Sequence, residues 1–277
     1  MSLHDPRLTP ARADLAASAL KGRVEAAAYA DGTAMVGSAG KTWIRRRPAA
    51  DAAVETELLF GETFTVYETK DGFCWGQAAL DAYVGYVAAA DLAAPGLKPT
   101  HRVIAASTFV YAAPDLKSPV RAVLPLNAKV TPGSGDYAEL ATGGYVFTGH
   151  LAPLAERDPD FVAVAERFQG VPYLWGGRTP LGFDCSGLVQ AALEMTGIAA
   201  PRDTDMQEAV LGQPVPQGDP LQRGDLVFWK GHVGMLQDAN TLLHANAHHM
   251  LTASEPLAPA IARIAAKGSP VTSIRRL

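Results

Sequence analysis

The pattern of apolar and polar positions changes twice along the chain. Between residues 8 and 30, Thr9 followed by Pro10 is typical of a helix start, because threonine caps the first turn and proline tolerates its first position. An alanine-rich stretch follows that contains Leu15, Leu20 and Val24. This pattern predicts an N-terminal helical segment over residues 1–30.

From Met35 to about Leu92 the chain consists of short alternating stretches bounded by glycine, aspartate or proline. Alternation with a period of two residues is typical of strands in a small all-β unit. The stretches are KTWIRRRP, GETFTVYET, GFCWGQA and YVGYVAAADL. We therefore expect a first β-domain over residues 31–95.

The next segment repeats this texture. STFVYAAPD parallels KTWIRRRPA, NAKVTPGSGDYAEL parallels GETFTVYETKDGFCWGQ, and GGYVFTGHL parallels VGYVAAADL. An internal repeat of this kind predicts two tandem small barrels, the second over residues 96–152, and the texture resembles bacterial SH3-like domains. The polar, proline-broken LAERDPD marks the boundary to the region that follows.

The third region, residues 153–277, begins with two helical patterns. PDFVAVAERFQG opens at Pro159 and closes at Gly170, and SGLVQAALEMTG closes at Gly197. The strand patterns GDLVFWK, HVGMLQ, TLLHAN and VTSIRRL come afterwards. Helices followed by an antiparallel sheet predict an α+β domain.

Composition and charge narrow the function classes. The 277 residues suffice for two or three domains. The net charge of −4 and the scattered basic residues give no indication of a basic surface that would bind nucleic acid. Charged residues interrupt the N-terminal stretch, so it does not read as a signal peptide, and no apolar run of about 18 residues predicts a membrane span. Two cysteines make no disulfide framework. We expect a cytoplasmic monomer with reduced thiols that binds neither nucleic acid nor membrane.

Cys185, in GFDCSGLVQ, lies where the second helical pattern begins. A thiol at a helix N-terminus lies at the positive end of the helix dipole, which favours the thiolate. The first-turn amides have no helical partners and can hold an oxyanion. Asp184 is a good capping residue, although its charge opposes a thiolate. A nucleophilic cysteine at this position still needs a base.

Two histidines in one predicted hairpin meet that need. In GHVGMLQDANTLLHANA, a turn centred on Asp238-Ala239 would place His232 opposite Ala245 and His244 opposite Val233. The two imidazoles would then be diagonal neighbours, one to take the thiol proton and the second to orient the first. A slip of one residue would reverse the face of a side chain.

Other interpretations of these residues remain open from the residues alone. A cysteine at a helix start is often a passive small residue, as we expect of Cys74 in a predicted strand. The histidines at 232, 244, 248 and 249 offer imidazoles to a metal, but no Cys-x-x-Cys or His-Glu-x-x-His spacing supports such a site. We therefore expect no metal and no cofactor.

Five ordered motifs over roughly the last 120 residues resemble the NlpC/P60 family of cysteine peptidases: VPYLWGG with FDCSGLV, then PRDTDMQ, GDLVFW, GHVGM and LLHA. The resemblance implies a papain-like α+β fold. It also implies Cys185 as the nucleophile, His232 as its general base, His244 as the third polar residue and Tyr173 as a hydroxyl near the nucleophile.

The resemblance further implies a substrate. Family members cleave cell-wall peptides between D-γ-glutamate and meso-diaminopimelate or lysine, and two preceding SH3-like units resemble recycling peptidases that release L-Ala-γ-D-Glu from free murein peptides. In those relatives the first unit admits only a free N-terminal L-Ala. By the same resemblance we expect substrate contacts at Glu62, Tyr83, Asp184, Ser186, Asp203 and Thr204. Arg202 would bind the D-Glu carboxylate or form a structural ion pair.

Two other functions compete with this one. The same cysteine would serve an amidase or acyltransferase that acts on a different substrate. A catalytically silent domain would leave a protein that only binds cell-wall peptides, but the intact set of Cys185, His232 and His244 speaks against it.

Overall fold

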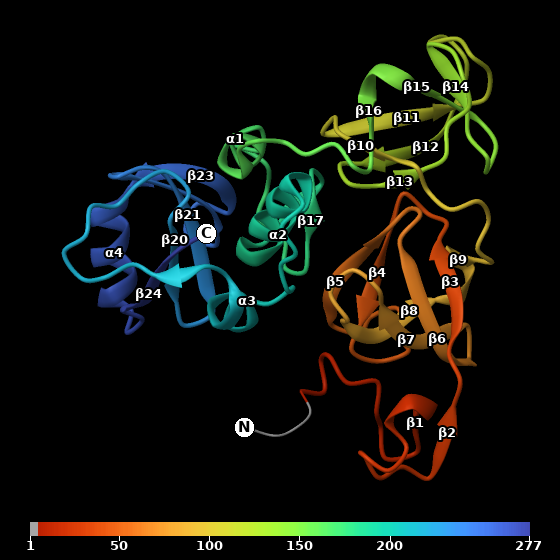
Figure 1. Ribbon diagram of the computed structural model, residues 1–277, viewed down its shortest axis with the longest axis horizontal. Helices are drawn as coiled ribbons and strands as arrows, with labels where there is room; N and C mark the ends of the chain where they lie inside the picture. The colour runs from red at the N-terminus through yellow and green to blue at the C-terminus, as the bar shows by residue number, and fades with distance from the viewer. Residues whose placement is uncertain (1–4) are drawn as a thin grey trace. The chain divides into compact units, whose positions relative to one another are not determined.

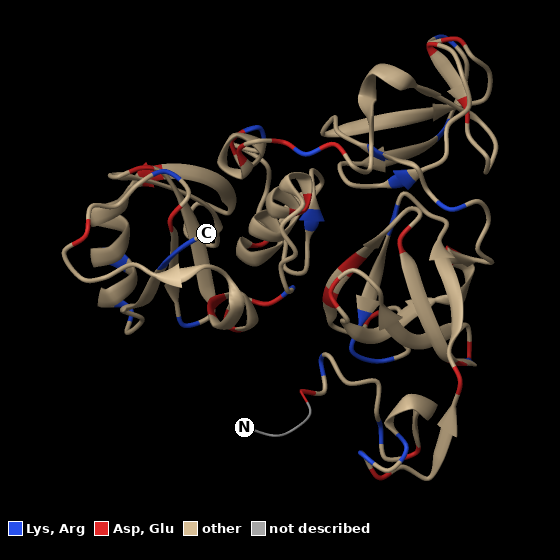
Figure 2. Cartoon of the chain, in the orientation of Figure 1, with Lys and Arg blue, Asp and Glu red and all other residues tan. Residues whose placement is uncertain are grey.

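The computed structural model describes residues 5–277 and divides the chain into two compact units (Figure 1). Unit 1 ends at Ala155 and unit 2 spans Glu156–Leu277. Among the described residues no helix is both long and apolar enough to cross a membrane. Basic and acidic residues are interspersed along both units, which fits the small net charge of −4 (Figure 2).

The N-terminal segment is not helical, so the helix predicted over residues 8–30 is wrong; residues 1–4 of that prediction lie outside the described residues. The segment forms strand β1 (Leu15–Ala17), the 3₁₀ turn η1 (Ser18–Leu20) and strand β2 (Ala28–Ala30), with β1 parallel to β2. Arg12 lies 4.3 Å from the centre of the Trp75 ring and pairs with Glu68 at 2.7 Å. Such contacts outweigh the helix propensity of alanine, which is the highest of any residue but is worth less than about 1 kcal/mol per residue.

The first half of the remaining unit 1 is a single antiparallel sheet of seven strands in the order β5-β4-β8-β7-β6-β3-β9. Its elements are β3 (Thr33–Gly37), β4 (Lys41–Arg45), β5 (Val54–Leu59), β6 (Thr63–Lys70), β7 (Phe73–Ala78), β8 (Val84–Ala88), the 3₁₀ turn η2 (Ala89–Asp91) and β9 (Leu92–Ala93). The strands alternate buried and exposed positions, and their buried side chains, including Ile44, Phe64 and Cys74, form one core with Tyr83, which lies just before β8.

The second half repeats this topology. Its elements are β10 (His101–Val103), β11 (Ser107–Tyr111), β12 (Val120–Pro125), β13 (Lys129–Val130), β14 (Tyr137–Glu139), β15 (Tyr145–Phe147), the 3₁₀ turn η3 (Thr148–His150) and β16 (Leu151–Pro153). The orders β12-β11-β15-β14 and β13-β10-β16 reproduce the order of the first half, with a break where β6 and β7 pair there. The repeat in the sequence is therefore also a repeat of strand order.

The two halves of unit 1 meet at the turn between β5 and β6. The amide of Lys129 donates to the carbonyl of Phe60 at 2.9 Å, and the Phe60 ring packs on the core of the second half. Gly61 has φ +75°, and a Cβ there would lie 2.1 Å from the Lys129 carbonyl oxygen. Only glycine fits this close approach of two backbones.

Unit 2 is an α+β domain built on a six-stranded antiparallel sheet in the order β19-β24-β20-β21-β22-β23 (Figure 1). Its elements are α1 (Phe161–Glu166), β17 (Arg178–Thr179), β18 (Gly182–Phe183), α2 (Cys185–Thr196), α3 (Thr204–Val210), β19 (Gln213–Pro214), β20 (Leu226–Trp229), β21 (His232–Asp238), β22 (Thr241–Asn246), β23 (Leu251–Pro256), α4 (Leu257–Ala266) and β24 (Val271–Arg276). Helices α1 and α2 confirm the two helical patterns of the sequence. Strand β23 and helix α4 were not foreseen.

Helices α2 and α4 both pack against the sheet of unit 2, and this packing positions the residues of the candidate active site. Helix α2 packs against α1, β21 and β22, and its ten buried residues make it the most enclosed helix of the described chain. Helix α4 buries Leu257 and Ala260 against sheet residues that include Trp229, Leu236 and Leu242. His232 pairs with Trp229 across the ladder, so it lies on the α4 side of the sheet.

Candidate active site

Helix α2 begins at Cys185 because Asp184 caps it. The Asp184 carboxylate accepts a hydrogen bond from the Gly187 amide at 2.7 Å, which satisfies one donor of the first turn. A Cβ on Gly187 would lie 2.1 Å from the carbonyl oxygen of Gly177. The glycine of the Cys-Ser-Gly motif therefore lets the preceding loop lie against the helix start.

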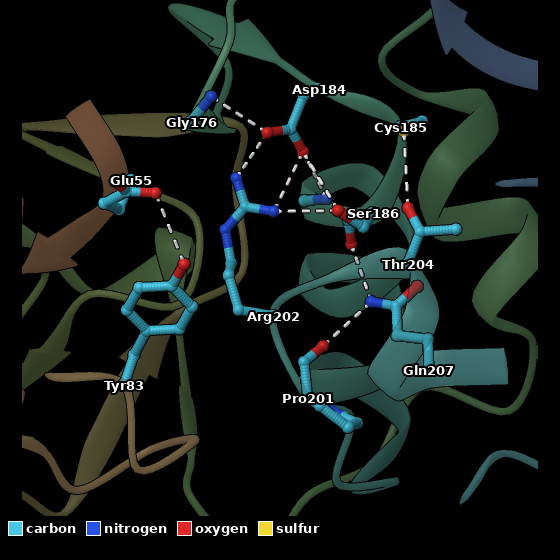
Figure 3. A network of polar contacts seen from close by, with 11 residues as sticks. Glu55, Tyr83, Gly176, Asp184, Cys185, Ser186, Pro201, Arg202, Thr204 and Gln207 are labelled. Atoms are coloured by element: carbon cyan, nitrogen blue, oxygen red, sulfur yellow. Dashed lines mark hydrogen bonds and ion pairs between the residues drawn. The ribbon is translucent and has the colours of Figure 1, made fainter. Parts of the chain in front are cut away.

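The capping carboxylate is held from a second side by Arg202 (Figure 3). The guanidinium donates to both oxygens of Asp184, at 3.0 and 2.6 Å, and to Ser186 Oγ at 2.9 Å. Gly176 donates to the same carboxylate at 2.9 Å. Arg202 is 1% exposed, so this is a buried bidentate ion pair.

This network decides between the two roles that the sequence left open for Arg202. Its guanidinium is committed to Asp184 and Ser186, which makes the structural ion pair the observed arrangement. Asp184 already accepts four hydrogen bonds from Gly176, Gly187 and Arg202. A contact of Asp184 with a substrate amine stays a prediction.

The thiol of Cys185 is buried between α2, α3 and the start of β21. Its sulfur lies 3.8 Å from Thr204 Oγ1, and the Val233 amide donates a hydrogen bond to it. Burial raises the pKa of Cys185, the Asp184 carboxylate raises it further, and the contacts with Thr204 and Val233 oppose this rise. Desolvation thus outweighs the helix-dipole effect that the sequence led us to expect.

The hairpin that carries the two histidines has a different register from the predicted one. Met235 pairs with Leu243, Leu236 with Leu242 and Asp238 with Thr241, with an irregularity between Leu236 and Asp238. The turn lies at residues 239–240, one position later than predicted. Continued from Met235 and Leu243, this register places Gly234 opposite His244, and a Cβ on Gly234 would lie 3.0 Å from the Cβ of His244.

The correction matters because residues that face each other across a ladder share one side of the sheet. The predicted register, with His232 opposite Ala245, would have turned His232 and His244 to opposite sides. The observed register puts both imidazoles on one side. His232 Nε2 lies 2.8 Å from His244 Nδ1.

Two further residues, a glutamate and an arginine, extend the hydrogen-bonded chain that begins with the two imidazoles. His244 Nε2 lies 2.8 Å from Glu255 Oε1 at the end of β23, and Arg263 of α4 donates to both oxygens of that carboxylate, at 2.6 Å to Oε2. The ion pair and the hydrogen bond lower the pKa of Glu255 to about 2. The carboxylate is therefore ionised at neutral pH.

The ionised Glu255 determines which nitrogens carry protons. A carboxylate only accepts, so neutral His244 holds its proton on Nε2 and presents the lone pair of Nδ1 to His232. His232 must then donate through Nε2, which leaves the lone pair of its Nδ1 available. This assignment follows from the hydrogen-bond network and gives His232 one basic nitrogen.

Burial keeps both imidazoles neutral. Desolvation lowers the pKa of His232 to about 3, helped by the neighbouring His244, and lowers that of His244 to about 4 against the opposing effect of Glu255. Together with the raised pKa of the Cys185 thiol, these shifts favour a neutral thiol on Cys185 and a neutral imidazole on His232. A protonated thiol must lose its proton to a base before it can act as a nucleophile.

Two other predicted residues of unit 2, Tyr173 and Thr204, lie close to the thiol, and a third, Asp203, lies at the start of α3. Tyr173 is half-buried; this burial raises the pKa of its hydroxyl, and the nearby Cys185 and Asp184 raise it further. Thr204 contacts the thiol as described, and Asp203 precedes it at the start of α3. Gln207 fastens α3 to α2 by donating to the Ser186 carbonyl at 3.0 Å (Figure 3).

The predicted pair of Glu62 and Tyr83 on unit 1 is arranged differently. Glu62 is 3% exposed, accepts from the Leu59 amide at 2.8 Å and faces Lys129. The carboxylate at the Tyr83 hydroxyl belongs to Glu55, at 3.5 Å (Figure 3). Glu55 and Tyr83 line a cavity of about 400 Å³ with Arg12, Arg46, Trp75 and Tyr86.

A larger cavity of about 1190 Å³ lies between the two halves of unit 1. Phe60, Lys98, Arg121 and Lys129 line it together with glycines, hydroxyl side chains and apolar side chains, and its described lining contains neither cysteine nor histidine. This cavity therefore offers no pair of a cysteine nucleophile and a histidine base. The candidate active site is instead the group of residues around Cys185 on unit 2.

Known protein families match both units. Residues 170–263 match the NlpC/P60 family, and residues 44–92 match the bacterial dipeptidyl-peptidase Sh3 domain. Unit 2 carries an NlpC/P60 domain. The NlpC/P60 match covers Cys185, both histidines and Glu255, and the Sh3 match covers Glu55, Glu62 and Tyr83.

The relatives of this chain include named peptidases. The chain is 28% identical over 226 residues to the γ-D-glutamyl-L-lysine dipeptidyl-peptidase of Bacillus subtilis, covering 70% of this chain and 73% of that protein. It is 36% identical over 120 residues to dipeptidyl-peptidase 6 of Lysinibacillus sphaericus, covering 39% of this chain but 43% of that protein. The second match thus spans less than half of the relative.

Solved structures share the fold. An NlpC/P60 family protein from Bacillus cereus superposes with a TM-score of 0.75 at 19% identity, over 88% of this chain and 99% of that chain. An NlpC/P60 endopeptidase from Photobacterium damselae gives 0.63 at 12% identity, over 88% and 71%. These matches confirm the predicted α+β fold with an SH3-like domain before the NlpC/P60 domain.

Sequence reasoning missed Glu255, Arg263 and Glu55. One signal for the first two was present: SEPLAPAIARIAAKG carries apolar residues at Leu257, Ile261 and Ile264, which is a helical spacing. A helix there would have placed Arg263 two turns after a strand-end glutamate. No comparable signal distinguishes Glu55 from Glu57 or Glu62 in VETELLFGE.

Proposed function

We propose that this protein is a cysteine peptidase that hydrolyses the bond between γ-D-Glu and a diamino acid in free murein peptides with an N-terminal L-Ala, releasing L-Ala-γ-D-Glu. The observation that carries the proposal is the placement of Cys185 at the first residue of α2, beside the strand that begins with His232, together with the chain from His232 through His244 to Glu255. The name of the Bacillus subtilis relative supports the class of bond.

In the first step, Nδ1 of His232 takes the thiol proton as the sulfur attacks the γ-glutamyl carbonyl carbon. The carbonyl oxygen becomes an oxyanion, and the first-turn amides of α2 stabilise it. The positive charge that develops on His232 is shared with His244, whose own proton faces the Glu255 carboxylate. A positioned base of this kind contributes about 10² to 10⁴ in rate.

In the second step, the tetrahedral intermediate collapses and the carbon–nitrogen bond breaks. The imidazolium of His232 returns its proton to the departing amine of the diamino acid, which leaves a thioester on Cys185. Water, deprotonated by the same imidazole, then hydrolyses the thioester and regenerates the thiol.

Recognition of the substrate's amino terminus is assigned to unit 1, by resemblance to recycling peptidases. An ammonium group requires an anionic partner, and the partly buried Glu55 carboxylate beside the Tyr83 hydroxyl supplies one. Glu55 already pairs with Arg46, so the ammonium would share the carboxylate with that guanidinium. Glu55 therefore replaces Glu62 in the proposal.

Four synthetic peptides test the function: L-Ala-γ-D-Glu-meso-diaminopimelate, its lysine counterpart and the N-acetylated form of each. Release of L-Ala-γ-D-Glu from the free-amine peptides alone is expected, and the ratio of the two rates identifies the diamino acid. Cys185→Ala should fold normally, by circular dichroism, and lose turnover. Cleavage of none of the four peptides by the wild type would favour an amidase or acyltransferase on another substrate.

The compartment and the oligomeric state remain predictions. Action in the cytoplasm on peptides released from the wall follows from the resemblance to recycling peptidases, and cell fractionation tests it. A monomer is expected by light scattering.

A further inference from the structure

His244 and two neighbouring side chains have the composition of a transition-metal site. Nitrogens of His244 and His249 and a carboxylate oxygen of Glu255 lie within 4.8 Å of one another. His244 lies on β22, His249 on the turn at residues 247–250, and Glu255 near the end of β23. We propose that His244, His249 and Glu255 form an inhibitory binding site for a divalent transition metal ion such as Zn²⁺.

The hydrogen bonds of Asn246 prepare His249 for this role. Asn246 Oδ1 accepts from the backbone amides of His248 and His249, at 3.1 and 2.8 Å, while its Nδ2 donates to the His244 carbonyl. The oxygen therefore faces His249 Nδ1, 3.1 Å away, so that nitrogen must donate. His249 Nε2 then carries a lone pair, and its ring is oriented in the way that metal-ligating histidines commonly are.

The set of donors suits Zn²⁺. Two imidazoles and one carboxylate with an open fourth position make a common zinc ligand set, and the carboxylate offsets part of the ion's charge. The atoms must approach one another to bind at about 2.0–2.2 Å. His249 is exposed and lies on a turn, so it can make most of that movement. Arg263 competes for the same carboxylate, which limits the affinity.

Metal binding at His244 changes the protons of the whole chain. A metal on His244 Nε2 requires that nitrogen's lone pair, so its proton moves to Nδ1 and points at His232 Nε2. His232 must then accept at Nε2 and carry its proton on Nδ1. No proton is lost or gained, but the only basic nitrogen of His232 becomes a donor. The bound ion thereby blocks deprotonation of the thiol without touching it.

The binding test uses the full chain without an affinity tag and with Cys185→Ser, which removes the competing thiol. Zn²⁺ titration by calorimetry and the visible absorption of bound Co²⁺ should report one ion per chain. Adding His249→Ala should weaken binding at least about tenfold, as loss of a ligand predicts. His248→Ala, whose ring neighbours that of His249 at 4.7 Å, is the matched control and should bind as before. Equal affinity with and without His249 would overturn the site.

The inhibitory role rests on the proposed peptidase activity, whereas the binding test does not, so the two can fail separately. In the chelator-treated enzyme with Cys185 intact, Zn²⁺ should inhibit peptide hydrolysis. The inhibitory concentration should rise in His249→Ala by the same factor as the dissociation constant, and should not change in His248→Ala. Inhibition of equal potency in both variants would place the ion at the thiol instead and contradict the proposal.

Discussion

At the residue scale, four side chains act as one unit because each constrains the protonation of the next. Arg263 and Glu255 form an ion pair whose negative partner faces His244, and His244 in turn faces His232. Since a carboxylate can only accept, the proton positions along the chain follow from its charge. The basic nitrogen of His232 thus depends on a residue that lies two hydrogen bonds away.

Glu255→Gln should therefore slow the enzyme. A neutral amide no longer demands a proton on His244 Nε2, so His232 loses its fixed tautomer, and kcat should fall about 10- to 100-fold with little change in KM. Glu255 raises the pKa of both histidines, so the acid limb of the pH–rate profile should also move to lower pH.

The control for this variant is Glu166→Gln, which removes a carboxylate that pairs with Arg223 away from the imidazoles. Its kcat and pH profile should match the wild type. A Glu255→Gln enzyme with unchanged kcat and an unchanged acid limb would contradict a positioning role for Glu255.

The buried histidines should make stability depend on pH. The folded pKa values, about 3 for His232 and about 4 for His244, lie below the ordinary 6.5, so the unfolded chain binds more protons between these values. The free energy of unfolding should therefore be highest above pH 6.5 and fall as the pH decreases, by up to about 1.4 kcal/mol per pH unit for each histidine. Urea titrations at several pH values measure the slope, which should be shallower in His232→Gln. Equal slopes would show that His232 is not buried in its neutral form.

At the scale of elements, the start of α2 is held by parts of the chain that come before and after it. The loop at Gly176 and Gly177 lies against the first turn of α2. Arg202, just before α3, forms an ion pair with Asp184, the residue that caps α2. Asp184 by itself caps the helix, and the bidentate guanidinium offsets part of its charge beside the thiol. The nucleophile is therefore positioned by three segments and not by its helix alone.

Arg202→Lys tests this arrangement. A lysine keeps the charge but cannot bind both carboxylate oxygens and Ser186, so the free energy of unfolding should fall by about 2–3 kcal/mol. The matched control is Arg223→Lys, whose pairs with Asp160 and Glu166 are partly exposed and should contribute about 1 kcal/mol or less. Chemical denaturation of both variants measures the difference, and similar losses would contradict a special role for the buried pair.

At the scale of the whole molecule, the two units carry separate tasks in the proposed function: unit 2 holds the nucleophile and its base, and unit 1 holds the partly buried Glu55 carboxylate beside a tyrosine. A hydrogen bond to a charged group is worth about 1.5–3 kcal/mol. Binding of the substrate's amine by unit 1 would therefore raise specificity for free-amine peptides by about one to two orders of magnitude.

Glu55→Gln should lower kcat/KM for the free-amine peptide about tenfold or more, and leave any slow hydrolysis of the N-acetylated peptide unchanged. Glu62→Gln is the control on the same unit, because Glu62 accepts from its own turn and faces Lys129. If Glu62→Gln abolished the preference for a free amine and Glu55→Gln did not, Glu62 would be the ammonium partner, as the sequence predicted, and the assignment of Glu55 would be wrong.

Patterns among residues near one another in the chain were enough to predict the order of the domains, one helix end and the family resemblance. The change from period-two alternation to helical spacing predicted the β-rich unit before the α+β domain, and the glycine at 197 predicted the end of α2. The ordered motifs led to the NlpC/P60 family and to Cys185, His232 and His244 as a set. These features are legible because each depends on residues that are near one another in the chain.

The tertiary structure decided what depends on distant partners. Contacts with Trp75 and Glu68 kept the alanine-rich N-terminus extended, and an irregularity in β21 brought both imidazoles to one side of the sheet. Likewise, desolvation set the thiol's pKa, and α4 supplied the arginine that ionises Glu255. Burial and ion pairing are sums over neighbours that the chain order does not place together, so the sequence determined the set of reactive groups and the fold determined their proton states.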